Sequence, residues 1–308
     1  MDLCNPRPSC SVSYYKHYPN PFVEYVSING FFMGNDNDKL RQFLVVFSIV
    51  SLIVMNYLSN AGVFGGQTNG EVSDKYHTLI TPAGYAFAIW GLIFLGLLAF
   101  AVYQALPSQR TNPRFQAIGP WVILNAFCNA IWSPLFNNEQ IGLALLVILV
   151  MLFSLIVIEQ KLLARHHVPV VAPDLDASLP ESYVSATETW LARVPFSIYF
   201  GWLTVATILN VAVYLEATEF DLFGLNEAEW GVIILVVGLV IGAFVFNRFR
   251  SLSYILVFAW AYVAIAVEQE GNERIPLFAI AGAVGAVLLA ISGIITRKPP
   301  VMELEVRH

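Results

Sequence analysis

Tryptophan and asparagine recur along one face of an apolar segment near residue 125. The recurring residues are Trp121, Asn125, Asn129 and Trp132. Their intervals of four, four and three residues place them on one side of an α-helix. Indole rings stack on flat apolar molecules, whereas amide groups donate and accept hydrogen bonds without changing charge. This face therefore offers aromatic rings and neutral hydrogen-bonding groups, and no group for acid–base chemistry.

Two other apolar segments, residues 82–104 and 194–215, carry faces of the same kind. Their members are Phe87, Trp90, Gly91 and Phe94, with Tyr85 close by, in the first and Tyr199, Trp202, Ala206 and Asn210 in the second. The alternative interpretation of all three faces is structural. Trp and Tyr commonly form belts at membrane interfaces, as we expect for Trp121 and Trp230, and buried Asn often only joins neighbouring helices.

Ionisable and metal-binding groups are scarce in the apolar segments. We single out one charge, Glu159, at a helix end where we expect it to reach water; the other charges, Arg41, Glu229 and Glu268, stand at segment ends. The histidines lie outside the segments, at His17, His77, His166, His167 and His308, and Cys4, Cys10 and Cys128 do not form a ligand set. Ion pumping, proton-coupled transport and a haem held by axial histidines are therefore disfavoured, and we expect no metal site.

The composition places these segments in a membrane. The 308 residues are 57% hydrophobic and 12% charged, with a mean hydropathy of +0.65, whereas about a quarter of the residues in soluble domains are charged. Crossing an apolar core of about 30 Å takes a helix of about 20 residues. Apolar runs suited to this occur at 40–58, 82–104, 117–136, 140–160, 194–215, 229–247, 251–268 and 275–296. We predict an all-α integral membrane protein with eight transmembrane helices.

The distribution of basic residues supports a count of eight. When connections are assigned alternately to two sides, 14 of the 16 Lys and Arg residues fall on one side, and only Lys75 and Arg274 fall on the other. Basic residues concentrate on the cytoplasmic side, so we predict that both termini are cytoplasmic. The opposite side carries an acidic segment at 216–229, which accounts for a net charge of −6 without a cationic partner.

The same pattern divides the chain into parts. We expect a disordered cytoplasmic tail at 1–38 with Met33 as an alternative start, five helices within 39–216, an acidic non-cytoplasmic linker at 217–228, a three-helix extension at 229–297, and a cytoplasmic tail at 298–308. Within the extension, small residues recur at helical spacing, at Gly238 and Gly242 and at Gly282, Ala286 and Ala290. They predict close helix contact, either against the five helices or in a homodimer.

Three stretches resemble the translocator protein family, also called TspO or tryptophan-rich sensory proteins. They are ITPAGYAFAIWGLIFLGLLAFAVYQ, NAIWSPLF followed by IGLALLVILVMLFSLIVI, and RVPFSIYFGWLTVATILNVAVYL, and the resemblance covers about residues 40–216. It implies a five-helix bundle whose pocket binds porphyrins, haem and, in some members, sterols or drug-like molecules. It also implies that the loop after the first helix, here 59–81, closes that pocket.

The resemblance assigns individual residues as well. Asn129, Trp132 and Pro134 fall on the family's Asn, Trp and Pro of the third helix, and Trp202 and Asn210 match its fifth helix. The chain departs from the family where the second helix usually opens with several prolines and a Trp, since it has Pro82 and Tyr85 there. It also has Val147 where a carboxylate is common in the fourth helix.

We therefore predict a membrane-embedded binder, carrier or sensor of a planar hydrophobic ligand. The first candidate ligand is a tetrapyrrole, such as a porphyrin or haem, and a sterol-like molecule is the alternative. The predicted ligand-binding residues are Tyr85, Phe87, Trp90, Asn125, Asn129, Trp132, Tyr199, Trp202 and Asn210, and the predicted lid residues are Tyr76 and His77. Two other functions stay open: a structural or assembly protein without a small ligand, and an enzyme that modifies porphyrins through Trp. Because no acid, base or metal site accompanies the rings, we expect binding without catalysis and without a required cofactor.

The expected partners are the lipid bilayer and a small hydrophobic ligand, with a homodimer as a further alternative and no nucleic acid. We expect the plasma membrane of a bacterium, with an organellar membrane as the alternative. The N-terminal segment has Arg7 as its only Arg before residue 41 and contains Glu24, Asp36 and Asp38. An organellar transit peptide would be rich in Arg and poor in acidic residues.

Overall fold

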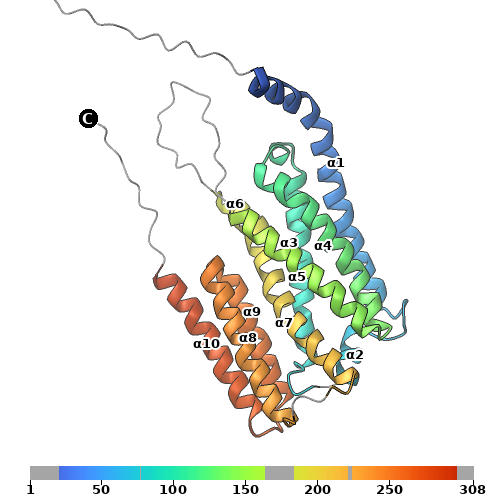
Figure 1. Ribbon diagram of the computed structural model, residues 1–308, viewed down its shortest axis with the longest axis vertical. Helices are drawn as coiled ribbons and strands as arrows, with labels where there is room; N and C mark the ends of the chain where they lie inside the picture. Colours follow the sequence, from blue (N-terminus) through green and yellow to red (C-terminus); the bar gives the residue numbers. More distant parts are fainter. Residues whose placement is uncertain (1–20, 77, 164–183, 221–223, 297–308) are drawn as a thin grey trace, which may run out of the picture.

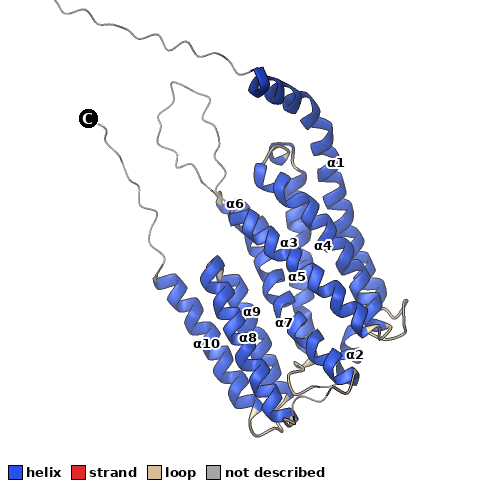
Figure 2. Cartoon of the chain, in the orientation of Figure 1, coloured by secondary structure: helices blue, strands red, loops and turns tan. Residues whose placement is uncertain are grey.

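The described residues are almost entirely helical. The computed structural model describes residues 21–76, 78–163, 184–220 and 224–296, and this part of the chain contains no strand (Figure 2). The helix α1 (Pro21–Asn60) begins within the segment expected to be a disordered tail. Residues 1–20 of that tail lie outside the described residues, as does the whole tail expected at 298–308.

The long helices follow one another with short connections, except between α1 and α3 and between α5 and α7. After α1 come α3 (Ile89–Ala105), α4 (Pro113–Asn137), α5 (Ile141–Leu163), α7 (Val194–Ala217), α8 (Glu227–Phe249), α9 (Leu252–Glu268) and α10 (Ile275–Ile295). The shorter elements are α2 (Asn69–Lys75), the 3-10 turns η1 (Gly84–Ala88) and η2 (Pro107–Gln109), the single turn α6 (Ala186–Glu188) and the π-helical turn η3 (Thr189–Arg193).

Six helical segments of the described chain are long and apolar enough to cross a membrane. They are Asp36–Asn60, Gly84–Ala105, Ile141–Leu163, Ala186–Ala217, Glu227–Phe249 and Ile275–Ile295. Helix α9 is apolar but has 17 residues, and α4 has 25 residues but is rich in polar side chains. The protein is thus an all-α, multi-pass integral membrane protein.

The first five long helices form a closed ring. Helix α1 packs against α3 and α4, α4 packs against α5, α5 packs against α7, and α7 returns to α3 (Figure 1). Helix α7 is the most enclosed, since 67% of its most apolar stretch is buried, against 28–39% for the other candidate spans. It also contacts α8 and α9 on its outer side, so it joins the ring to the rest of the molecule.

The last three helices, α8 to α10, pack together beside the ring (Figure 1). Their small residues make room for aromatic rings. A Cβ atom added at Gly282 would lie 2.3 Å from the Tyr262 ring, and one at Gly242 would lie 3.0 Å from the Phe258 ring. The small-residue faces of α8 and α10 are therefore filled by α9 within the same chain.

Helix α9 approaches α7 at a glycine. A Cβ atom added at Gly201 would lie 2.7 Å from the backbone oxygen of Tyr254, so only glycine permits this approach. Next to it, the Tyr254 hydroxyl donates to Thr204 Oγ1 at 3.3 Å, and Trp260 Nε1 donates to the carbonyl of Ala86 at 3.2 Å. These contacts fix the extension to the ring.

One end of the ring is closed by buried charges. Arg114 Nη1 donates to Glu188 Oε1 at 3.2 Å, and the two side chains are only 10% and 7% exposed. Glu159 accepts a hydrogen bond from Ser197 at 2.9 Å and is 3% exposed. The expectation that Glu159 reaches water was wrong, because α7 covers the helix end that the sequence left open.

Replacing Gly201 with Leu is expected to weaken the contact between α7 and α9. A larger side chain cannot fit against a backbone oxygen, and overpacking of this kind costs about 1–3 kcal/mol. Thermal unfolding in detergent should show a lower Tm for Gly201→Leu. Gly91→Leu is the matched control, since nothing lies within 4 Å of a Cβ atom added there. An equal Tm for the two variants would contradict the close contact.

Candidate functional site

A cavity of about 280 Å³ lies where α1 ends, α2 begins and α3 begins. The residues that line it are Asn56, Asn60, Thr68, Asn69, Gly70, Gly84, Phe87, Trp90 and Phe94. Amide and hydroxyl groups come from α1 and from the segment that leads into α2, and aromatic rings come from η1 and α3. One side of the cavity is therefore polar and uncharged, and the other is aromatic.

The aromatic side is a continuous set of ring contacts centred on Trp90. The Trp90 ring stacks on Phe94, with centroids 5.5 Å apart, and meets the ring of Tyr199 edge to face at 5.9 Å. The ring of Trp202 meets Trp90 at 6.4 Å and Phe87 at 6.0 Å. The sequence-predicted residues Phe87 and Trp90 thus line the cavity, while Tyr199 and Trp202 lie behind them.

A hydrogen-bond chain crosses the ring directly behind the cavity. Asn56 Nδ2 donates to Asn129 Oδ1 at 2.6 Å, and Asn129 Nδ2 donates to the hydroxyl of Tyr199 at 2.7 Å. The three residues belong to α1, α4 and α7 and are each less than 5% exposed. Because an amide inside a membrane bundle is costly unless it is paired, this chain fixes how the three helices meet.

The segment that covers the cavity is attached to the ring by further amides. Asn60 Nδ2 donates to the carbonyl of Asn56 at 3.0 Å, and the backbone N–H of Asn69 donates to Asn60 Oδ1 at 3.3 Å. Ser133 donates to Asn69 Oδ1 at 3.0 Å. Thr68 then caps α2 through a reciprocal pair of hydrogen bonds with Glu71. We call residues 67–76 the lid.

The lid is latched by Glu139, which lies in the turn between α4 and α5 and has a positive φ of 57°. Its carboxylate accepts from Lys75 Nζ at 2.6 Å, from the Tyr76 hydroxyl at 2.7 Å and from Gln67 Nε2 at 3.0 Å. The hydrogen bonds from Lys75, then Gln67 and Tyr76, lower the pKa of Glu139 to about 2. Tyr76, a predicted lid residue, is part of this latch, and His77 lies outside the described residues.

Three other predicted residues join helices away from the cavity. Asn125 Nδ2 donates to Ser154 Oγ at 2.8 Å and to the Met151 carbonyl at 3.1 Å, both on α5. Trp132 Nε1 donates to Asn210 Oδ1 at 3.3 Å, which joins α4 to α7. None of these three residues is among those that line the cavity.

Tyr85 lies at the junction with the extension. It is 43% exposed, and its ring meets that of Trp260 on α9 edge to face, with centroids 5.4 Å apart. Its neighbour Gly84 lines the cavity. The backbone of η1 thus contributes to the cavity while the Tyr85 side chain contacts α9.

The sequence reasoning missed the polar side of the cavity. Asn56 and Asn60 stand four residues apart near the end of an otherwise apolar helix. That spacing puts both on one face, which is the same signal that predicts a shared face for Asn125 and Asn129. Asn69 and Thr68 carried no comparable signal, because their position depends on how the lid folds back.

The indole of Trp202 is an unusual buried group. The residue is 1% exposed, and its Nε1–H finds no hydrogen-bond acceptor among the described residues. Buried donors are nearly always paired.

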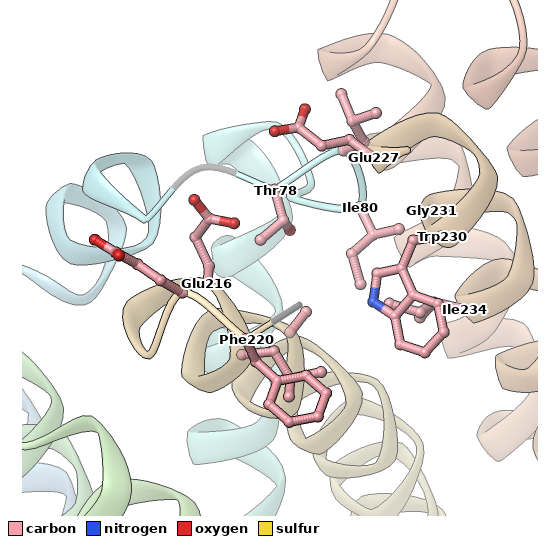
Figure 3. Close-up of a pocket in the computed structure, with 12 residues that line it drawn as sticks. Thr78, Ile80, Glu216, Phe220, Glu227, Trp230, Gly231 and Ile234 are labelled. Atoms are coloured by element: carbon pink, nitrogen blue, oxygen red, sulfur yellow. The ribbon is translucent and has the colours of Figure 1, made fainter. Parts of the chain in front are cut away.

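A second cavity, of about 290 Å³, lies between residues 78–80, the end of α7 and the start of α8 (Figure 3). Carboxylates of Glu216, Glu219 and Glu227 line it, together with the rings of Phe220 and Trp230. The three glutamates are exposed. Such a lining disfavours an anionic ligand, and the cavity holds none of the predicted ligand-binding residues.

A third cavity of about 450 Å³, lined mainly by apolar residues of α3, α7 and α9, opens between the ring and the extension. The described residues include no group of three or more His, Cys, Asp or Glu side chains placed to hold a metal ion. Of the three cavities, the one beneath the lid is lined by residues that the sequence predicts to bind the ligand, Phe87 and Trp90.

Comparison with known families identifies one match. The family model described as TSPO-like protein matches residues 42–295. The match continues past residue 216 and includes α8, α9 and α10, which the resemblance seen in the sequence did not cover. No curated protein and no solved structure compared with the chain matches it.

Replacing Glu139 with Gln is expected to loosen the lid, since the neutral amide cannot hold Lys75. Amide hydrogen exchange of residues 67–76 should be faster in Glu139→Gln than in the unaltered protein. Asp74→Asn is the matched control, because it removes an exposed carboxylate from α2 itself, outside the latch. Equal exchange in the two variants would contradict the latch.

The latch also predicts a dependence on pH. The pKa of Glu139 is about 2 with the lid closed, against an ordinary pKa of 4.5. Its carboxylate therefore stabilises the closed lid fully above pH 4.5, and this contribution is lost as the pH falls toward about 2. Lid exchange, corrected for intrinsic rates, should therefore be constant from pH 8 to about pH 5 and rise only below about pH 4.5. A rise between pH 8 and pH 6 would show that another group controls the lid.

Proposed function

Because the chain belongs to the TSPO-like protein family, we propose that it binds a planar, largely apolar ligand within the membrane, with a tetrapyrrole as the first ligand class to test. The observation that carries this proposal is the cavity beneath the lid, with aromatic rings on one side and uncharged polar groups on the other. Ligand sites are typically apolar and contain a few placed polar groups. Binding, carrying and sensing all begin with this step.

The size of the cavity bears on how a ligand enters. Its volume of about 280 Å³ is at the low end for ligand sites, which commonly reach about 300–1,000 Å³. A tetrapyrrole would need more space than the closed cavity has. We propose that the lid moves away from Glu139 as such a ligand enters, since the latch is exposed enough for water to replace its hydrogen bonds.

The charge distribution supports a topology for this binding site. We propose that all eight long helices cross the membrane, with the basic end of the molecule cytoplasmic and the lid on the opposite side. Helix α9 has 17 residues, which span about 26 Å at 1.5 Å per residue, and α4 keeps its amides inside the ring. The same pattern suits the plasma membrane of a bacterium or an organellar membrane.

A structural role has less support from the helix packing. The small residues that suggested a docking face, Gly238 and Gly242, already receive the side chains of Tyr262 and Phe258. A purely structural protein would also have little use for a cavity lined by three aromatic rings beneath a latched segment. The proposal includes no chemical step, and it assigns Trp90 and Phe94 to stacking on the ligand.

Titration of the detergent-purified chain with protoporphyrin IX or haemin should quench Trp fluorescence in a saturable way. Trp90→Leu is expected to raise Kd by about threefold to tenfold, because a stacked ring pair contributes about 0.5–1.5 kcal/mol beyond its buried area. Trp121→Phe is the matched control, since Trp121 pairs with Phe153 outside the cavity. Linear quenching without saturation would refute a tetrapyrrole ligand, and equal Kd values would move the site elsewhere.

A further inference from the structure

The cavity between the ring and the extension opens on the outer surface of the molecule. It has a volume of about 450 Å³, and we call it the seam groove. Two residues on its walls, Leu92 of α3 and Leu256 of α9, are 53% and 47% exposed. The residues that line it are Ala88, Ile89, Leu92, Ile198, Ser253, Leu256, Val257 and Trp260.

The walls of the seam groove are apolar at membrane depth. Two of them, α3 and α7, belong to the candidate membrane spans Gly84–Ala105 and Ala186–Ala217. The indole N–H of Trp260 already donates to the carbonyl of Ala86 at 3.2 Å. Water gains little in such a groove, because it needs polar partners, whereas a hydrocarbon chain gains dispersion contacts with the walls. The lining therefore favours an acyl chain.

One end of the seam groove is next to positive charge. Ser253 stands in the first turn of α9, and the connection from α8 to α9 just before it carries Arg248 and Arg250. Arg250 precedes Ser253 by three residues, so their Cα atoms are at most about 11 Å apart. Both arginines are exposed, and within the described part of the chain neither forms an ion pair. Their guanidinium groups are suited to binding a phosphate.

The length of the seam groove matches a chain that stays in one leaflet. Its apolar end includes Trp260, seven residues after Ser253 along α9. Seven residues of α-helix span about 10 Å, and half of a bilayer's apolar core measures about 15 Å. A chain that enters beside the arginines thus reaches Trp260 without crossing the middle of the membrane.

We propose that the seam groove binds an acyl chain of an anionic phospholipid, whose phosphate lies at Arg248, Arg250 and Ser253. Basic residues between transmembrane helices commonly bind anionic lipid headgroups. A sterol has no charge for the arginines to bind, and a free anion gains nothing from apolar walls. The lipid fills space between α3 and α9 and so stabilises the contact of the ring with the extension. This site is separate from the cavity beneath the lid, since the two share no lining residue.

Native mass spectrometry of the delipidated full chain in detergent tests the lipid class. Dioleoyl phosphatidylglycerol and dioleoyl phosphatidylcholine have the same acyl chains and a phosphate, but only the first has a net negative charge. We expect the apparent Kd of the first bound lipid to be at least about threefold lower for phosphatidylglycerol. Cholesterol, the uncharged comparison, should not displace it.

Two variants locate the site. Leu256→Trp fills the groove and should raise the apparent Kd of phosphatidylglycerol by at least about threefold, because the acyl chain loses its contacts with the walls. Arg250→Gln should reduce the preference for phosphatidylglycerol to less than about twofold. Because Arg250 is exposed, its replacement leaves the packing intact and covers the case in which Leu256→Trp fails to fold.

The matched controls lie on α5, outside the groove. Leu146→Trp adds the same ring to a residue that is 61% exposed, and Lys161→Gln removes a basic group from the last turn of that helix. Both should bind phosphatidylglycerol as the unaltered chain does. Equal affinity for the two phospholipids, or a preference that survives Arg250→Gln, would overturn the proposal. An unchanged Kd in folded Leu256→Trp, or displacement of the lipid by cholesterol, would overturn it as well.

Discussion

The hydrogen-bond chain from Asn56 through Asn129 to Tyr199 is the constraint on which the site depends. Amides in an apolar bundle must find partners inside the protein, since lipid offers none. By pairing across α1, α4 and α7, these groups fix the end of α1 relative to the ring. Asn60, four residues later, then receives the lid through the backbone of Asn69. The position of the lid is thus a consequence of how buried amides are satisfied.

Helix α7 connects the ring to the extension. Its inner face holds Tyr199 and Trp202 behind the cavity, and its outer face admits α9 at Gly201. The family match across residues 42–295 treats these parts as one unit. The extension is therefore a support for the wall of the site, as well as the boundary of the acidic cavity between α7 and α8.

Much of the fold follows from the sequence, because apolar length and helical spacing are local properties. The spacing of Asn129 with Trp132, and of Tyr199 with Trp202, gave the inward faces of α4 and α7. Spacing does not reveal the partner of each group. Asn125 has the same spacing as Asn129 yet bonds α5, because its partner depends on which helix lies next to it.

The lid was less predictable for the same reason. Tyr76 was expected to cover the pocket, but the carboxylate that holds it, Glu139, lies more than sixty residues away in the chain. Such a contact exists only once the ring has closed. Burial of Glu159 beneath α7 likewise follows from tertiary packing, whereas the sequence placed that residue at an open helix end.

Photoaffinity labelling tests the location of the site most directly. A protoporphyrin that carries a diazirine group would be bound to the full chain and photolysed, and the labelled residues would be mapped by peptide mass spectrometry. The account predicts labels within residues 56–70 and 84–94, reduced by an excess of unmodified ligand. Competed labels confined to residues 212–234, the other cavity at this end of the molecule, would contradict a binding site beneath the lid.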